Sequence, residues 1–549
     1  MSGSITLENR FGVNKMQLIS SKYAIFVIVL LVLYYCFPKK YRWYVLLAGS
    51  MAYYVIICKW YVLFIIFTIC TTYGSTIWID KLLKEQNAIV KSHKEDWDRQ
   101  TRKEYKEKGR KKRVAVMLFA LLCNFGILAF LKYIPYAGEL GLLLPLGISF
   151  YTFQSMGYVM DVYREIVEPE KNFLKVALFV SFFPQIIQGP IAIYDKLAGQ
   201  LYEGHSLRLE NLQKGALLVL WGVMKKLVIA DRAVNIINFV MDKPMDFSGT
   251  YVFFAAVVYA LQLYADFSGG IDIVRGIAEM FGITMSTNFN HPYFSRSLTE
   301  YWHRWHMTLG DWCRNYIFYP LSISKRFLNF GKWLKPRFGA HISKVLPGCI
   351  ASVITFIVIG VWHGANMKYL CFGLWNGIVI MLAELFAPVN KKVAGGFFKL
   401  TGLREKGIFA TIVSVLWTFM LILVGYYFDI AANASTAFHM FFKSVTDFHI
   451  SELGINNIIL NLGACGLDEY DILLLIICTL LWFFISFVEE NKKLDMRDFI
   501  LSRKLPLRWV IIYLGIFIVI IFGYYGPGVN PADFVYMQSE SMLPGSPEA

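Results

Sequence analysis

The sequence predicts an all-α polytopic membrane protein with about eleven to fourteen transmembrane or re-entrant helices. Hydrophobic residues make up 56% of its 549 residues. Charged residues make up 17%, whereas a soluble protein carries about a quarter. The charges also gather between long apolar runs instead of spreading along the chain. We therefore expect a single membrane-embedded domain over residues 1–549.

Twelve apolar stretches predict the elements that cross the membrane. They lie at about 22–38, 44–58, 61–79, 114–131, 173–190, 214–231, 250–266, 346–362, 367–387, 408–428, 472–488 and 508–526. A further stretch, 141–160, is interrupted by Pro145 and Gly147, and it predicts either another span or a re-entrant segment. Several stretches are shorter than the ~20 residues of a simple crossing, which is tolerated where the backbone is buried in protein or lines a cavity. The core is expected at about 114–430, and the C-terminal helices at 472–526.

The net charge of +15 comes largely from basic segments beside the apolar runs. Residues 80–113 contain thirteen Lys or Arg and seven Asp or Glu, and 39–42, 325–344 and 491–508 are also basic. Such segments stay in the cytoplasm under the positive-inside rule. We therefore expect no nucleic-acid partner and a multi-pass protein of the plasma membrane, with 80–113 as a basic cytoplasmic loop. Two spans between 39–42 and 80–113 then place the N-terminus outside.

One histidine lies in the most apolar part of the chain, in the run Val361-Trp362-His363-Gly364. The fifteen residues before Trp362 carry no charge. An imidazole there is costly to desolvate, so it needs a hydrogen-bonding partner, a wet path or a chemical role. Two interpretations stay open: a structural histidine that ties two helices together, or a general base that accepts a proton from a hydroxyl.

A second histidine, His306, lies in segment 288–320, which is dense in charge and indole. Arg304, Trp305 and Arg314 belong to the same segment. It could be an interfacial aromatic belt with snorkelling arginines. It could equally form a cationic mouth for a phosphate-bearing donor, since arginine binds phosphate in a bidentate manner.

Polar side chains interrupt apolar sequence at Gln154, Gln185 and Asp266. Polar groups within a membrane line a pathway or join helices. The sequence has no phosphate-cradling loop, no serine nucleophile elbow and no Cys/His spacing typical of a metal site. We therefore predict no metal, and a histidine-assisted direct transfer is more economical than an acyl-enzyme.

Together these motifs resemble the membrane-bound O-acyltransferase (MBOAT) family. The likeness is to its bacterial branch of alginate and peptidoglycan O-acetylation proteins, related to the teichoic-acid D-alanylation protein. The matching pieces are 144–154, 161–164, 183–185, 189–190, 264–269, 288–289, 302–316 and 362–364. They cover about residues 144–375, and the flanks match by hydropathy alone. Where the family often has an arginine, this chain has His303.

The resemblance implies a cup of helices around a central tunnel. The family's catalytic histidine falls on His363, and its second histidine on His306. Substrate or donor contacts are implied for Arg304, Trp305, Arg314, Trp362, Gln154, Gln185 and Asp266.

The implied activity moves an acyl group, acetyl in this branch, from a cytoplasmic thioester to an extracytoplasmic hydroxyl, with His363 as general base. The donor is acyl-CoA (acetyl-CoA) or an acyl-carrier thioester, and no cofactor stays bound. The acceptor is a glycan or cell-wall polymer, reached directly or through an extracytoplasmic SGNH-type acyltransferase partner. Two alternatives remain: D-alanyl transfer from a carrier protein to teichoic acid, and a non-enzymatic transporter. Transporters usually show internal repeats, and none is visible here.

Overall fold

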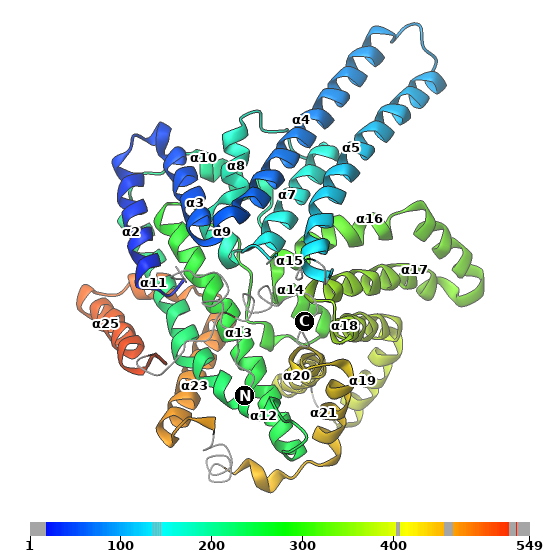
Figure 1. The fold of residues 1–549 in the computed structure, drawn as a ribbon. Coiled ribbons are helices and arrows are strands. Elements are labelled where there is room, and N and C mark those ends of the chain that lie inside the picture. Colours follow the sequence, from blue (N-terminus) through cyan, green and yellow to red (C-terminus); the bar gives the residue numbers. More distant parts are fainter. Residues whose placement is uncertain are drawn as a thin grey trace. The chain divides into compact units, whose positions relative to one another are not determined.

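The computed structural model describes residues 18–134, 137, 140, 142, 144–401, 404, 407–454, 465–525 and 534, apart from the side chains of 397 and 398. Its secondary structure over these residues is helical, without a strand, so the predicted all-α class is confirmed (Figure 1). The described residues form two compact units. The first contains those up to Val219 together with Ile271–Ser286, and the second contains Leu220–Gly270 and those from Thr287 onward. The expectation of one domain around a tunnel stays a prediction.

Eight stretches of the described chain are long and apolar enough to cross a membrane, which confirms the polytopic class. They are Lys39–Ser92, Arg99–Tyr133, Gly249–Met280, Lys325–His363, Met367–Leu385, Ile408–Ile430, Glu469–Lys492 and Leu505–Phe522. Two shorter apolar helices lie at Ser21–Cys36 and Phe173–Gln188. The first of the eight contains two successive helices, so the described elements approach the lower end of the predicted range.

The first unit begins with a helical N-terminal half. Its helices are α2 (Ser21–Cys36), η1 (Lys39–Tyr41), α3 (Arg42–Cys58), η2 (Lys59–Tyr61), α4 (Val62–Ser92), α5 (Arg99–Tyr133), α7 (Ile148–Tyr163), α8 (Phe173–Ser181), α9 (Phe183–Gln188), α10 (Tyr194–Tyr202) and most of α11 (Leu209–Met224). Helix α7 packs against α4, α5 and α9, and every residue from Ile148 to Val162 is buried. It is therefore a core helix that is buried on all sides.

Helix α7 begins later than the predicted stretch 141–160, of which residues 141 and 143 lie outside the described part. Gly147 precedes the helix with a φ of 69°, in the left-handed region that favours glycine. A Cβ at Gly147 would lie 2.1 Å from the carbonyl oxygen of Ile186. The close approach of α9 therefore requires glycine here and fixes the start of α7.

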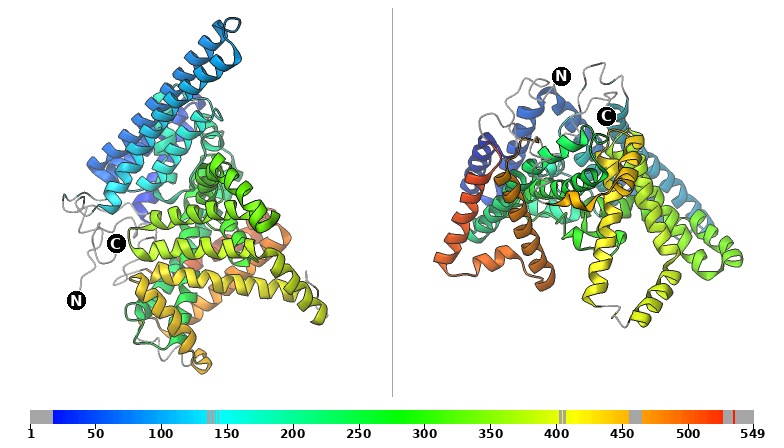
Figure 2. Two further views of the ribbon diagram at one scale, coloured as in Figure 1. Left: turned by 90° about the vertical axis from the view of Figure 1, so that its right-hand side faces the viewer. Right: turned by 90° about the horizontal axis from the view of Figure 1, so that it is seen from below.

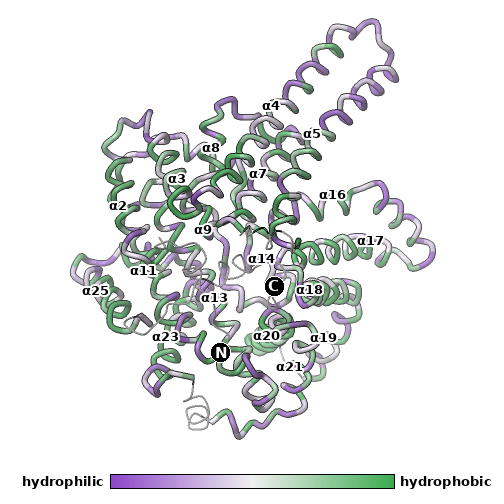
Figure 3. The backbone as a smooth tube through the Cα atoms, in the orientation of Figure 1, coloured by the Kyte–Doolittle hydropathy of each residue, from purple (hydrophilic) through white to green (hydrophobic). Residues whose placement is uncertain are grey.

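The basic segment 80–113 is mostly helical, although the sequence analysis treated it as a loop. Helices α4 and α5 continue through it as a long hairpin that turns at 93–98 (Figure 1). Lys, Arg, Glu and Gln are good helix formers, and the Asp98 side chain caps α5 by accepting the Thr101 N–H at 2.9 Å. The far part of the hairpin is hydrophilic, whereas the near part is apolar (Figure 3).

The second unit contains the end of α11, η3 (Lys225–Ala230, π-helical), α12 (Asp231–Met241), most of α13 (Gly249–Met280), η4 (Pro292–Phe294), α14 (Leu298–Arg304), α15 (Met307–Cys313), η5 (Arg314–Phe318, π-helical), α16 (Tyr319–Ser322), α17 (Lys325–His363), α18 (Met367–Leu385), α19 (Ala387–Thr401), α20 (Ile408–Ile430), α21 (Ala434–Thr446), η6 (Ile450–Leu453), α23 (Glu469–Lys492), α24 (Met496–Leu501) and α25 (Leu505–Phe522). Single π-helical turns of this kind are frequent at functional sites.

Helices α17 and α18 lie side by side as an antiparallel hairpin (Figure 2). Glycines allow the two backbones to touch. A Cβ at Gly360 would lie 2.3 Å from the carbonyl oxygen of Tyr369, and one at Gly373 would lie 2.3 Å from that of Phe356. Helix α17 also kinks at Gly339, where φ is 81°, so only its second half corresponds to the predicted span 346–362. The tight pairing holds the end of α17 in a defined place.

Candidate functional site

The first part of the site is the chain that leads into α15. Segment 288–290 runs alongside 304–307: the Asn290 N–H donates to the Arg304 carbonyl at 3.0 Å, and the Met307 N–H donates to the Asn288 carbonyl at 2.9 Å. The buried Asn288 side chain adds two contacts, because its Oδ1 accepts the Thr308 N–H at 3.1 Å and the Thr308 hydroxyl at 2.9 Å. These bonds fix the turn that carries His306.

His306 occupies the N-cap position of α15 with a φ of 44°, an uncommon conformation for a residue other than glycine. Its side chain is only 4% exposed, and Nδ1 lies 3.2 Å from Oδ1 of Asn288. Burial lowers the pKa of His306 to about 3, and the nearby imidazole of His363 acts in the same direction. The imidazole of His306 is therefore neutral at physiological pH.

His363 is the last residue of α17. Its ring lies almost parallel to that of Tyr369, with centroids 6.0 Å apart, and edge-on to Phe372 at 5.5 Å. Gly364, which follows, lies against Tyr369: a Cβ there would come within 2.5 Å of Cε2 of that ring. The Trp-His-Gly sequence thus places an imidazole at the end of a helix, next to the rings of Tyr369 and Phe372. Glycine at position 364 lets the Tyr369 ring approach this closely.

The two candidate catalytic histidines lie in the same neighbourhood. Trp362 is buried, and its ring centroid lies 6.2 Å from that of His306 and 4.9 Å from that of His363. Phe267 of α13 packs edge-on against His306 at 5.0 Å. Residues far apart in the sequence therefore form one cluster of two imidazoles and aromatic rings. Trp362, expected as a substrate contact, belongs to this cluster.

Two tryptophans, one within α14 and one at its C-terminal end, pack next to the cluster. The Trp302 indole N–H donates to Oδ1 of Asn376 on α18 at 3.0 Å. Trp305 is buried and packs on Phe289 with centroids 5.0 Å apart. This packing supports a structural contribution from Trp305, and its expected contact with substrate stays a prediction.

The two arginines of the segment are held by carboxylates. Arg304 lies 2.7 Å from Glu300 and 3.0 Å from Glu490 of α23. Arg314 pairs with Asp311, and both of these side chains are about 40% exposed. Their positive charges are thus partly balanced within the protein, so the role of either arginine toward a donor stays a prediction.

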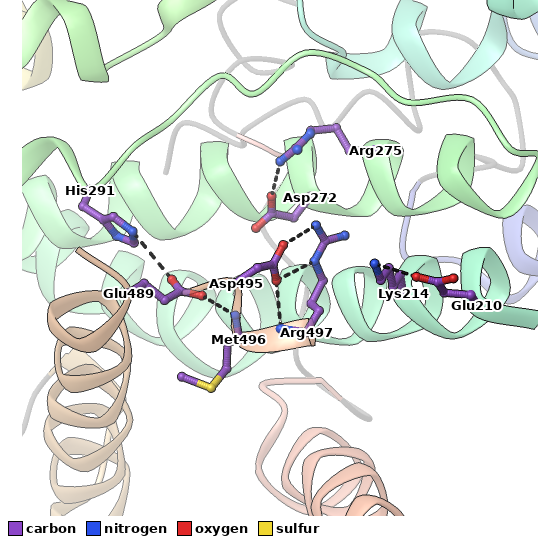
Figure 4. A network of polar contacts seen from close by, with 9 residues as sticks. All are labelled: Glu210, Lys214, Asp272, Arg275, His291, Glu489, Asp495, Met496 and Arg497. Carbon is purple, nitrogen blue, oxygen red and sulfur yellow. Dashed lines mark hydrogen bonds and ion pairs between the residues drawn. The ribbon is translucent and has the colours of Figure 1, made fainter. Parts of the chain in front are cut away.

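The end of α23 holds the same segment at another point. His291 Nε2 lies 3.6 Å from a carboxylate oxygen of Glu489, whose other oxygen accepts the Met496 N–H at 3.2 Å (Figure 4). Glu490 pairs with Arg304, so two neighbouring carboxylates of α23 contact segment 291–304. The turn with His306 is therefore braced from a helix that follows it by more than 150 residues of sequence.

Asp266 belongs to a buried ion group that the sequence analysis missed. The Lys226 ammonium lies 2.6 Å from Asp266 and 2.8 Å from Asp231, and all three side chains are at most 2% exposed. Neighbouring Lys225 donates to the Ser268 hydroxyl at 2.8 Å. The pair Lys225-Lys226 within an apolar run was the available signal, because a lysine in such a place needs a carboxylate partner. The ion pair with Lys226 thus anchors α13 at Asp266, the residue before Phe267.

Gln154 and Gln185 lie in the first unit. The Gln154 amide donates to the Phe179 carbonyl at 2.6 Å, and the Gln185 amide donates to Oε1 of Gln154. Both side chains are 2% exposed. These bonds join α7, α8 and α9, and a role for either glutamine toward substrate stays a prediction.

Comparison with known proteins finds a family for part of the chain. Residues 169–335 match the profile of the MBOAT, membrane-bound O-acyltransferase family. His306 and its turn lie within the matched residues, whereas His363 lies beyond them.

Several curated proteins are also similar to this chain. A probable alginate O-acetylase of Pseudomonas syringae pv. tomato is 30% identical over 57% of this chain and 54% of its own length. A peptidoglycan O-acetyltransferase of Helicobacter pylori is 30% identical over 50% and 56%, respectively. A teichoic acid D-alanyltransferase of Bacillus subtilis is 26% identical over 51% and 67%. The chain thus spans somewhat more than half the length of the O-acetylation relatives it matches. The branch named in the sequence analysis is confirmed.

Proposed function

We propose that this protein is a membrane O-acyltransferase that transfers an acetyl group from a cytoplasmic thioester, acetyl-CoA, to a hydroxyl of an extracytoplasmic envelope or exopolysaccharide acceptor. The observation that carries the proposal is the pairing of His306 and His363 around Trp362 in a chain that matches the MBOAT family over residues 169–335. The names of the relatives favour polysaccharide or cell-wall acceptors.

In the proposed reaction, His363 takes the proton of the acceptor hydroxyl as its oxygen attacks the thioester carbonyl carbon. A C–O bond forms, the C–S bond breaks, and the thiolate leaves. His363 then returns its proton to the thiolate, so the products are an ester and free CoA. The position of His363 at the end of α17 supports this role, because its side chain there is only partly buried. No covalent enzyme intermediate is needed.

The proposal includes an orientation. The basic hairpin 80–113 lies in the cytoplasm, where the donor is made, and the N-terminus lies outside. In one route the hydroxyl belongs to the polymer itself, and in the other it belongs to an SGNH-type partner that passes the acetyl group on. Both routes use the same chemistry at His363.

The second candidate function is D-alanyl transfer from a carrier protein to teichoic acid, which the similarity to the Bacillus subtilis enzyme favours. A transporter is the non-enzymatic alternative, and it would release no CoA. The three cases differ in their products: acetyl esters with free CoA, D-alanyl esters, or neither.

The test uses cells that lack the gene and carry either the wild-type chain or the His363→Ala variant. Mild alkali releases envelope esters, and acetate and D-alanine are quantified in the same hydrolysate. We expect acetate to be restored by the wild type and lost in the variant at equal protein level. Restored acetate with His363→Ala would refute the proposed base, and restored D-alanine alone would select the second function.

A further inference from the structure

The hydrogen bonds around Asn288 determine which way its amide faces. Oδ1 lies 3.1 Å from the backbone nitrogen of Thr308, and a backbone N–H can only donate. The atom that faces it must therefore be the amide oxygen. This assignment comes from chemistry and holds without any choice between two similar amide orientations.

The same oxygen then fixes the hydrogen on His306. Nδ1 lies 3.2 Å from Oδ1 of Asn288, and an amide oxygen only accepts. Nδ1 must therefore carry the hydrogen. Because the imidazole is neutral, Nε2 is left with a lone pair and no hydrogen.

Nε2 of His306 is an unsatisfied acceptor in a buried place. The residue is 4% exposed, and Nε2 has no hydrogen-bond partner within the described structure. Phe267 and Trp362 line its surroundings with aromatic rings. Buried polar atoms of this kind are rare and call for a ligand, so a donor group from outside the chain fits here.

We propose that Asn288 is a positioning residue that holds His306 in its Nδ1–H tautomer, so that Nε2 accepts a hydrogen bond from a second hydroxyl of the acceptor, one that does not react. This inference rests on the proposed function for the identity of that hydroxyl. It decides between two roles for His306, which are to orient the acceptor or to stabilise the developing oxyanion by donating a hydrogen bond. A neutral imidazole whose only hydrogen points at Asn288 cannot donate to an oxyanion, so His306 orients the acceptor, and His363 takes the proton.

The experiment compares Asn288→Leu, Asn288→Asp and the control Asn290→Ala. Asn290 is exposed and lies two residues away in the same segment. Membrane vesicles with each variant receive radiolabelled acetyl-CoA, and the label in alkali-labile esters is followed across pH. We expect Asn288→Leu to lose about 10- to 100-fold in rate, since a lost orienting partner disturbs the imidazole it holds. Asn290→Ala should behave like the wild type.

Asn288→Asp keeps the acceptor and adds a negative charge. It should retain activity at high pH, but its charge raises the pKa of His306, so activity should fall off at a higher pH on acidification than in the wild type. If Asn288 had only a structural role, the pH dependence of activity in Asn288→Asp would match that of the wild type. Wild-type rates and profiles for both Asn288 variants would overturn the inference. So would an Asn288→Asp variant that is folded and inactive at every pH.

A second measurement is independent of turnover. Nitrogen-15 resonances of labelled histidine in the purified protein, assigned with His306→Gln, should show a protonated Nδ1 and an unprotonated Nε2 at His306. The opposite tautomer would overturn the inference even if vesicles are active. Vesicles that incorporate no acetate, with the expected tautomer intact, would refute the proposed function instead.

Discussion

The two regions that carry His306 and His363 hold their imidazole rings in place in different ways. His306 sits in an irregular turn, fully buried, with one ring nitrogen bonded to Asn288. His363 ends a long helix, is less buried, and stacks on Tyr369. The first imidazole is fixed by directed hydrogen bonds, and the second by the rigid packing of α17 on α18. Under the proposed function, the comparison teaches that an orienting group is held by its hydrogen bonds in one tautomer, whereas a proton acceptor is held in place by packing.

The largest expected effect tests the second region. His363→Ala should lower the rate of ester formation by about 10²–10⁴-fold, because general-base help is typically of this size. The measurement is acetate incorporation in vesicles at matched protein level. His439→Ala, which removes an exposed histidine of α21, is the control and should keep the wild-type rate. Equal rates for the two variants would remove the distinction between the regions.

The next effect tests the support behind the first region. Lys226→Met leaves Asp231 and Asp266 buried without their cation, which should cost about 3–5 kcal/mol and lower the melting temperature in detergent. Adding Asp266→Asn should recover part of the loss. Lys214→Met breaks the partly exposed pair with Glu210 (Figure 4), and because such pairs contribute little, it should change the melting temperature much less. An unchanged melting temperature for Lys226→Met would show that this ion group does not brace α13.

The same two regions also show what could and could not be predicted from the sequence. His363 was singled out because an imidazole within apolar sequence is costly, and His306 because it lies in a segment dense in charge and indole. The fold class followed from the apolar runs. The partners were not predictable: Glu490 is 186 residues from Arg304, and Asn288 bonds His306 across 18 residues. No local pattern encodes such contacts. The helical state of 80–113 could have been expected from its Lys and Glu content, but the charge pattern led to a loop.

A smaller effect tests the packing that holds His363. Gly360→Ala would place a methyl group 2.3 Å from the Tyr369 carbonyl oxygen, so α17 and α18 must separate, at about 1–3 kcal/mol. We expect a lower melting temperature and a lower rate together. Gly348→Ala lies in the same helix, where nothing is within 4 Å of a new Cβ, and should be neutral or slightly stabilising. Identical behaviour of the two variants would mean that the hairpin does not position His363.

The smallest effect is a pH dependence that belongs to the first region. The folded-state pKa of His306, about 3, lies below the ordinary 6.5, so the unfolded chain binds more protons between these values. Stability is therefore complete above pH 6.5 and falls as the pH drops, by about 1 kcal/mol between pH 6 and 5. His306→Gln should flatten this slope in melting experiments across pH. A slope unchanged in that variant would assign it to other groups.

The α4–α5 hairpin has a practical consequence for placing the whole chain in its membrane. Its turn at 93–98 is flanked by basic residues, and its two helices are long enough to separate that turn from their apolar parts. Trypsin added to one face of sealed vesicles would cut there without entering the bilayer. Protection in right-side-out vesicles and cleavage in inverted ones would place this turn on the cytoplasmic face.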